Sequence, residues 1–132
     1  MIKHFTAEHM DEDRVIADAR ELIARVGRIH AAGLVHGDLN WTNIRFSEQG
    51  PAFVDLDDTR AYRLGPRRNY GIIRDWRVLI YNLRDHPELA ALFHELIRAH
   101  LGDTAFQRVI ARPFRDHNGQ RTLKTALTAS RL

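Results

Sequence analysis

A short polar segment, His36 to Asn43, lies between a long helical pattern and a predicted β-hairpin. It reads His-Gly-Asp-Leu-Asn-Trp-Thr-Asn, and a second segment, Phe53 to Asp57, reads Phe-Val-Asp-Leu-Asp. Asp38, Asn43 and Asp55 are thus an acid, an amide and a second acid beyond the hairpin. In phosphoryl-transfer sites one carboxylate orients a hydroxyl, while an amide and another carboxylate hold Mg²⁺ against nucleotide phosphates. The two segments therefore predict a phosphoryl-transfer site.

The chain before this segment predicts a helix from about Asp11 to Ala32. Acids crowd its start, where they suit the helix dipole, and Gly33 suits the position that follows a helix. Its apolar residues recur at helical spacing: Val15, Ala19, Leu22, Ile23, Val26 and Ile29.

The middle of the chain predicts short strands. Leu34–Val35 is a short buried run, and Asn43 to Phe46 and Ala52 to Leu56 are predicted strands joined by a loop over 47–50. Pro51 suits the start of an edge strand, and the segment 60–69 is predicted as a basic connector.

Further helices are predicted in the second half. They run over 70–83, from Pro87 to a stop at Gly102, and from a cap at Asp103 through Ile110. Asp85 or His86 is the predicted cap of the helix that begins at Pro87. The remainder, about 112–132, is a basic tail with little apolar content.

The composition of the chain predicts one domain over 1–132, mainly α with a short β-hairpin (α+β). A formal charge of +3 fits an anionic substrate, a nucleotide or a membrane surface without choosing among them. The chain has no cysteine, which excludes disulfides and thiolate zinc sites. No apolar run has a membrane-spanning length and no signal peptide is apparent, so we expect a cytoplasmic protein. Sparse aromatics and dispersed basic residues argue against nucleic-acid binding.

Other acids and one histidine near the predicted site have two interpretations each. Asp57 is an additional metal ligand or a solvated acid, and Asp58 is a solvated or capping residue. His36 is a general base or, as we favour, a residue that hydrogen-bonds the backbone and fixes the loop. Asp75 is either a buried acceptor of backbone N–H groups near His36 or a surface acid at a helix start.

Four arginines, Arg60, Arg63, Arg67 and Arg68, follow the second acidic segment. Guanidinium groups pair well with phosphates and carboxylates, so this stretch is a candidate for binding an anionic acceptor. A solvated charged face is the alternative.

The stretch from Arg28 to Asn40, followed by Phe53 to Asp57, resembles the lipopolysaccharide kinase (Kdo/WaaP type) family of the protein-kinase-like superfamily. Aminoglycoside and choline phosphotransferases share the local pattern. The resemblance covers roughly residues 11 to 83 and implies the C-terminal lobe of a kinase. It implies ATP and Mg²⁺ as cofactors, and a sugar hydroxyl of the lipopolysaccharide core (Kdo or heptose) as acceptor. It also implies a cytoplasmic location with peripheral contact at the inner membrane.

By this resemblance Asp38 matches the catalytic aspartate, and Asn43 and Asp55 match the metal-binding residues. Asp75 matches the aspartate on the helix that supports the catalytic loop. Gly37 stands where regulated protein kinases carry Arg, which implies no switching by phosphorylation of an activation loop. The interval from Asp55 to Asp75 holds no Ala-Pro-Glu motif, which favours a small or glycolipid acceptor over a protein.

The resemblance gives no counterpart to the N-terminal nucleotide-binding lobe, because only about ten residues precede the first helix. We therefore expect a lobe that is incomplete by itself. One alternative is a non-catalytic interaction module, or the partner half of a split kinase that binds a separate N-terminal lobe or itself. Another is an aminoglycoside- or choline-kinase-like enzyme, although an Arg-rich 60–68 segment favours an anionic acceptor.

Overall fold

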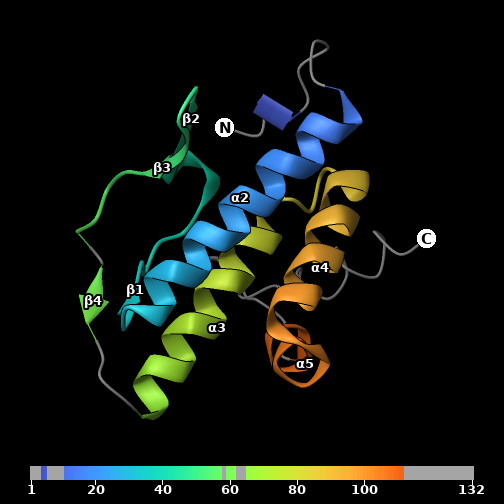
Figure 1. Cartoon of the computed structure of the whole chain (residues 1–132). Coiled ribbons are helices and arrows are strands. Elements are labelled where there is room, and N and C mark those ends of the chain that lie inside the picture. The colour runs from blue at the N-terminus through green and yellow to red at the C-terminus, as the bar shows by residue number, and fades with distance from the viewer. Residues whose placement is uncertain (1–3, 6–10, 58, 62–64, 112–132) are drawn as a thin grey trace.

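The computed structural model describes residues 4–5, 11–57, 59–61 and 65–111. In this part, helices α2 (Glu12–Ala31), α3 (Pro66–Tyr81), α4 (Pro87–Leu101) and α5 (Asp103–Ala111) pack together, and two small antiparallel sheets lie beside α2 and α3 (Figure 1). The predicted class, mainly α with a short hairpin, is confirmed.

Helix α2 has the predicted bounds within one residue at each end. Asp11 is its N-cap, and the Asp11 carboxylate accepts the backbone N–H of Arg14 at 2.7 Å. At the other end Gly33 has a φ of 84°, the left-handed conformation that glycine adopts without steric cost. The helix therefore delivers the chain into β1 (Leu34–Val35).

The hairpin is tighter than predicted. Strand β2 (Ile44–Ser47) pairs with β3 (Gly50–Phe53), and Ser47 lies opposite Gly50. The turn is therefore two residues long instead of the predicted 47–50 loop. Strand β3 ends at Phe53 rather than Leu56, because Asp55 has a φ of 57° and cannot continue an extended strand.

The predicted connector over 60–69 is wrong at both ends. Arg60 and Ala61 form β4, which pairs antiparallel with β1. Helix α3 begins at Pro66, earlier than the predicted residue 70, because proline is well suited to the first position of a helix. Apolar periodicity failed here because the first turn of α3 is polar.

Helices α4 and α5 have nearly the predicted bounds. His86 is the N-cap residue of α4, one of the two predicted residues, although its side chain makes no capping hydrogen bond. Asp103 lies inside α5 as its first residue. The predicted basic tail, 112–132, lies outside the described residues.

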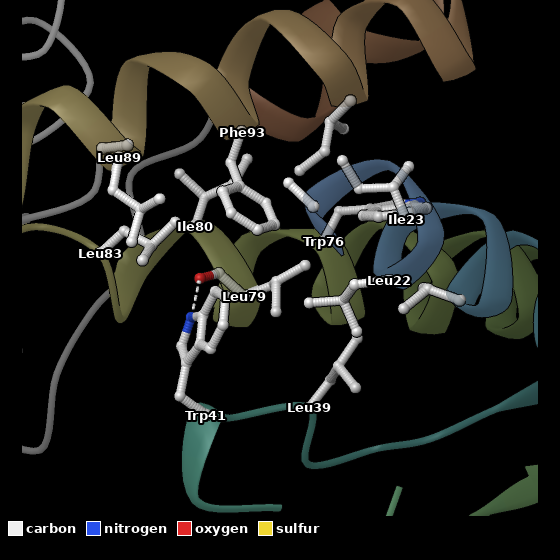
Figure 2. Packing of buried hydrophobic residues seen from close by; sticks show 14 of the residues in the cluster. Leu22, Ile23, Leu39, Trp41, Trp76, Leu79, Ile80, Leu83, Leu89 and Phe93 are labelled. Atoms are coloured by element: carbon white, nitrogen blue, oxygen red, sulfur yellow. Dashed lines mark hydrogen bonds between the residues drawn. The ribbon is translucent and has the colours of Figure 1, made fainter. Parts of the chain in front are cut away.

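The polar loop that follows β1 is attached to the core by two apolar residues. Leu39 and Trp41 are buried, and both point from the loop towards α3 (Figure 2). The Trp41 indole Nε1 donates to the carbonyl of Leu79 at 2.8 Å. Trp41 also makes an edge contact with Phe93 of α4. The loop that carries the candidate site is thus packed on a rigid helical layer.

His100, near the end of α4, makes stability depend on pH. Its ring packs against Trp76 and Gly27, and this partial burial, together with nearby His30, lowers the pKa of His100 below 6.5. The unfolded chain therefore binds the proton more tightly, so this contribution is complete above pH 6.5 and is lost as pH falls below it.

We expect His100→Gln to reduce the loss of stability at acidic pH. Urea unfolding midpoints of the variant and the parent, measured well above and well below pH 6.5, check this. If the midpoint fell between the two pH values by the same amount in His100→Gln as in the parent, this expectation would be contradicted.

Candidate functional site

The start of the 36–43 loop is held by Asp75 of α3. The Asp75 carboxylate is 1% exposed and accepts the backbone N–H of His36 at 2.9 Å and of Gly37 at 3.0 Å. His30 of α2 supplies a third bond, from Nε2 at 2.8 Å. A carboxylate with three such neighbours acts as an acceptor, which assigns the His30 proton to Nε2. One buried side chain therefore joins α2, α3 and the loop.

His36 connects the loop to the segment that follows β3. Its ring is buried; Nδ1 accepts the backbone N–H of Asp38 at 3.2 Å, and Nε2 lies 3.3 Å from the carbonyl of Val54. With Nδ1 as acceptor, Nε2 carries the proton and donates to Val54. Both ring nitrogens are therefore occupied within the fold, which favours a structural role over that of a general base.

Asp38 and Asn43 contact each other directly. The Asn43 Nδ2 group donates to the Asp38 carbonyl at 2.9 Å and to Asp38 Oδ2 at 3.1 Å. Asn40 donates to the other carboxylate oxygen of Asp38 at 2.8 Å. Asp38 is only half-buried, so the two amides orient a carboxylate that solvent still reaches. With its Nδ2 used in this way, Asn43 retains its side-chain oxygen as an acceptor or metal ligand.

The segment that carries Asp55 is hydrogen-bonded to Asn43. The backbone N–H of Val54 donates to the carbonyl of Asn43 at 2.8 Å. Asp55 is exposed, and within the described residues its carboxylate has no hydrogen bond or ion pair. Its φ of 57° lies in the left-handed region, which is uncommon for residues other than glycine and which Asp and Asn adopt more often than most. Such outliers concentrate at functional sites, so the conformation is a reason to suspect a function here.

The remaining acids of the second segment give less information. Asp57 is exposed, and its carbonyl accepts from the Arg60 guanidinium at 3.1 Å. Asp58 lies outside the described residues. Asp57 is therefore a solvated acid at the end of the second segment, and none of its contacts among the described residues supports a role as a metal ligand.

The arginines make bonds within the fold where their side chains are described. Arg60 donates to carbonyls of its own turn, and Arg68 donates to the carbonyl of His30 at 3.1 Å. Arg63 and the side chain of Arg67 lie outside the described residues. The Arg60 contacts stabilise its own turn, and the Arg68 contact joins α3 to the end of α2. Neither contact identifies a substrate.

The donor set fits a metal that arrives with a nucleotide. In the described part of the chain no group of three or more His, Asp or Glu side chains is arranged to hold a metal ion. Asn43 and Asp55 would offer one amide oxygen and one carboxylate. Mg²⁺ commonly takes one or two protein oxygens and completes its shell with phosphates and water.

Two contributors to the site were missed in the sequence. His30 stands in the last turn of α2, and its ring binds the buried carboxylate of Asp75. Thr59, just beyond the second segment, donates its hydroxyl to the carbonyl of His36 at 3.4 Å and so contacts the loop. The sequence signal for either residue is weak, because both contacts are between residues distant along the chain.

Comparisons with known proteins leave the geometry as the basis for a functional proposal. Among the described helices none has the length and apolar character needed to cross a bilayer. No protein-family model matches the chain, and no curated protein or solved structure shows significant similarity to it.

Proposed function

We propose that this chain is a kinase-like phosphotransferase domain that uses ATP and Mg²⁺. The observation that carries the proposal is a continuous set of hydrogen bonds: Asn43 contacts Asp38 through its side chain and Val54 through its carbonyl. These bonds place an oriented carboxylate beside an amide and join Asn43 to the residue that precedes the exposed Asp55. Phosphoryl transfer depends mainly on positioning and charge stabilisation, which such an arrangement supplies.

Each residue has a distinct role in this proposal. Asp38 orients the acceptor hydroxyl and receives its proton as the oxygen attacks the γ-phosphorus and ADP leaves. Asn43 and Asp55 would hold Mg²⁺, with Asp57 as a further candidate ligand. Bound Mg²⁺ would neutralise charge on the nucleotide phosphates. Asp75 and His36 keep the loop in place and do not react.

The acceptor in this proposal is a sugar hydroxyl of the lipopolysaccharide core. The family resemblance supports it, and Arg60, exposed just beyond Asp57, is compatible with an anionic glycolipid. An aminoglycoside- or choline-kinase-like activity differs only in the acceptor. A screen of phosphorylated core sugars against aminoglycosides and choline separates the two.

A second candidate, one half of a split kinase or an interaction module, is favoured by one observation. Val54 and Leu56, on either side of Asp55, are 37% and 59% exposed. Large apolar side chains beside a polar site are typical of a surface covered by another lobe or chain. Sedimentation tests this, since a monomer that binds no hydrophobic dye would argue against such a surface.

Calorimetry of ATP binding tests the proposed function. We expect binding that requires Mg²⁺ and weakens by about tenfold or more in Asp55→Ala, because one metal ligand is lost. Asp85→Ala is the matched control, since Asp85 is an exposed acid in the loop between α3 and α4. Equal binding by Asp55→Ala and the parent, or no Mg²⁺-dependent binding by the parent, would refute the proposal.

A further inference from the structure

The tip of the β2–β3 hairpin is bound by one arginine of helix α2. The Arg25 guanidinium donates through Nη2 to the carbonyl of Gln49 at 2.8 Å and through Nη1 to the carbonyl of Pro51. Its Nε donates to Glu21 on the same helix at 2.8 Å. Because all three nitrogens of a planar group are used, the direction of Arg25 is fixed, and its two outer nitrogens lie on the hairpin.

Gly50 on the hairpin and Glu21 on α2 both favour the contact between Arg25 and the hairpin tip. A Cβ atom at Gly50 would lie 2.9 Å from Arg25 Nη2, so the absence of a side chain there admits the guanidinium. Gly50 also has a φ of 95°, which disfavours other residues. On α2, hydrogen bonds from Arg25 and then Arg28 hold the pKa of Glu21 below 4.5, so Glu21 is ionised when it orients Arg25.

The same hairpin joins the two proposed metal ligands. Strand β2 starts directly after Asn43, and β3 ends two residues before Asp55. At its base the hairpin is closed by the bond from Val54 N–H to the Asn43 carbonyl. Its tip is bound to α2, the helix whose His30 also contacts Asp75. Helix α2 therefore contacts the hairpin tip directly, through Arg25, and the start of the 36–43 loop indirectly, through His30 and Asp75.

We propose that Arg25 is a positioning residue for the Asn43–Asp55 pair, a role that rests on the proposed function. By fixing the hairpin tip against α2, Arg25 restricts rotation of the hairpin about its base. This keeps the side-chain oxygens of Asn43 and Asp55 at a constant separation. Groups behind metal ligands commonly change metal affinity by about tenfold or more when removed, because they set ligand geometry.

Arg25→Ala and Arg25→Lys test the role. Lysine keeps the charge but has a single donor group, so it cannot bind both carbonyls as a fork does. Arg28→Gln is the matched control, because Arg28 contacts the same glutamate at 3.1 Å without reaching the hairpin. Val109→Ala, in the core of α5, is the control for a general loss of stability.

Hydrogen exchange at the Val54 amide is the first readout. We expect exchange about fivefold to tenfold faster in both Arg25 variants, from the loss of bonds that hold the hairpin. Arg28→Gln should exchange like the parent at Val54. The amide exchange does not depend on nucleotide binding, so it decides the role of Arg25 even if the proposed function fails. Unchanged exchange at Val54 would overturn the inference.

The second readout is the Mg²⁺ concentration required for ATP binding. We expect about a tenfold increase in Arg25→Ala and a smaller one in Arg25→Lys. Arg28→Gln and Val109→Ala should leave it unchanged, because neither contacts the hairpin. An equal increase in Val109→Ala would reduce Arg25 to a stabilising residue and overturn the positioning role. If the parent binds no Mg²⁺–ATP, the proposed function is lost and amide exchange alone decides.

Discussion

Asp75→Asn is expected to lower the free energy of unfolding by about 3 kcal/mol or more. The Asp75 oxygens accept from two backbone N–H groups and from His30 in a buried site. Asparagine keeps one acceptor oxygen and places an NH₂ group where the other stood. At least one of the buried donors then loses its acceptor and faces the new NH₂ group instead. Two donors that face each other away from water are destabilising. Chemical unfolding followed by circular dichroism measures the change.

Asp18→Asn is the matched control for Asp75. Asp18 also contacts a histidine, His4, at 2.7 Å, but both side chains of that pair are 23% exposed. Partly solvated pairs contribute little, so we expect a loss of about 1 kcal/mol or less. Amide exchange should also rise selectively at His36 and Gly37 in Asp75→Asn. A loss in Asp75→Asn no larger than in Asp18→Asn would show that the buried carboxylate does not hold the loop.

Asp38→Ala is expected to lower the rate of phosphoryl transfer about 10²- to 10⁴-fold, the range for removal of a general base. Stability should change little, because Asp38 is half-buried and, among the described residues, its carboxylate is hydrogen-bonded to Asn40 and Asn43 alone. ATP-dependent phosphorylation of a core-sugar acceptor is the measurement, with unfolding midpoints recorded in parallel.

Asn40→Ala distinguishes the contribution of the Asp38 carboxylate from that of a residue that only orients it. It removes one amide that orients the Asp38 carboxylate but leaves the carboxylate itself. We expect a decrease of up to about tenfold, well short of that in Asp38→Ala. Turnover retained by Asp38→Ala would exclude Asp38 as the catalytic residue.

Helices and the main hairpin could be predicted because their signals are local. The apolar spacing of α2 and the Asp11 cap mark that helix within the chain segment itself. Strand β4 could not be predicted, because two residues carry no periodicity and pair only with the distant β1. The early start of α3 was missed because Pro66 opens a polar turn in which no apolar pattern exists.

The candidate site follows the same division between local and distant contacts. The spacing of Asp38 and Asn43 lies within one loop, so their relation could be inferred from the sequence. The contacts of Asp75 agree with the buried-acceptor interpretation, whereas its part in catalysis stays a prediction. The bonds from His30 and Arg25 join residues 45 and 26 positions apart, respectively, and no pattern in one sequence reports such pairs. The left-handed backbone of Asp55 likewise depends on its surroundings.

The most direct test of the proposed half-site replaces Mg²⁺ with paramagnetic Mn²⁺ in the presence of ATP. If Asn43 and Asp55 hold the metal, nuclear magnetic resonance signals of the Asn43 side-chain amide and the Asp55 backbone should broaden first. The broadening should disappear in Asp55→Ala and persist in Asp85→Ala. Broadening centred elsewhere, or none at these residues when ATP is present, would contradict a nucleotide-bound metal site at Asn43 and Asp55.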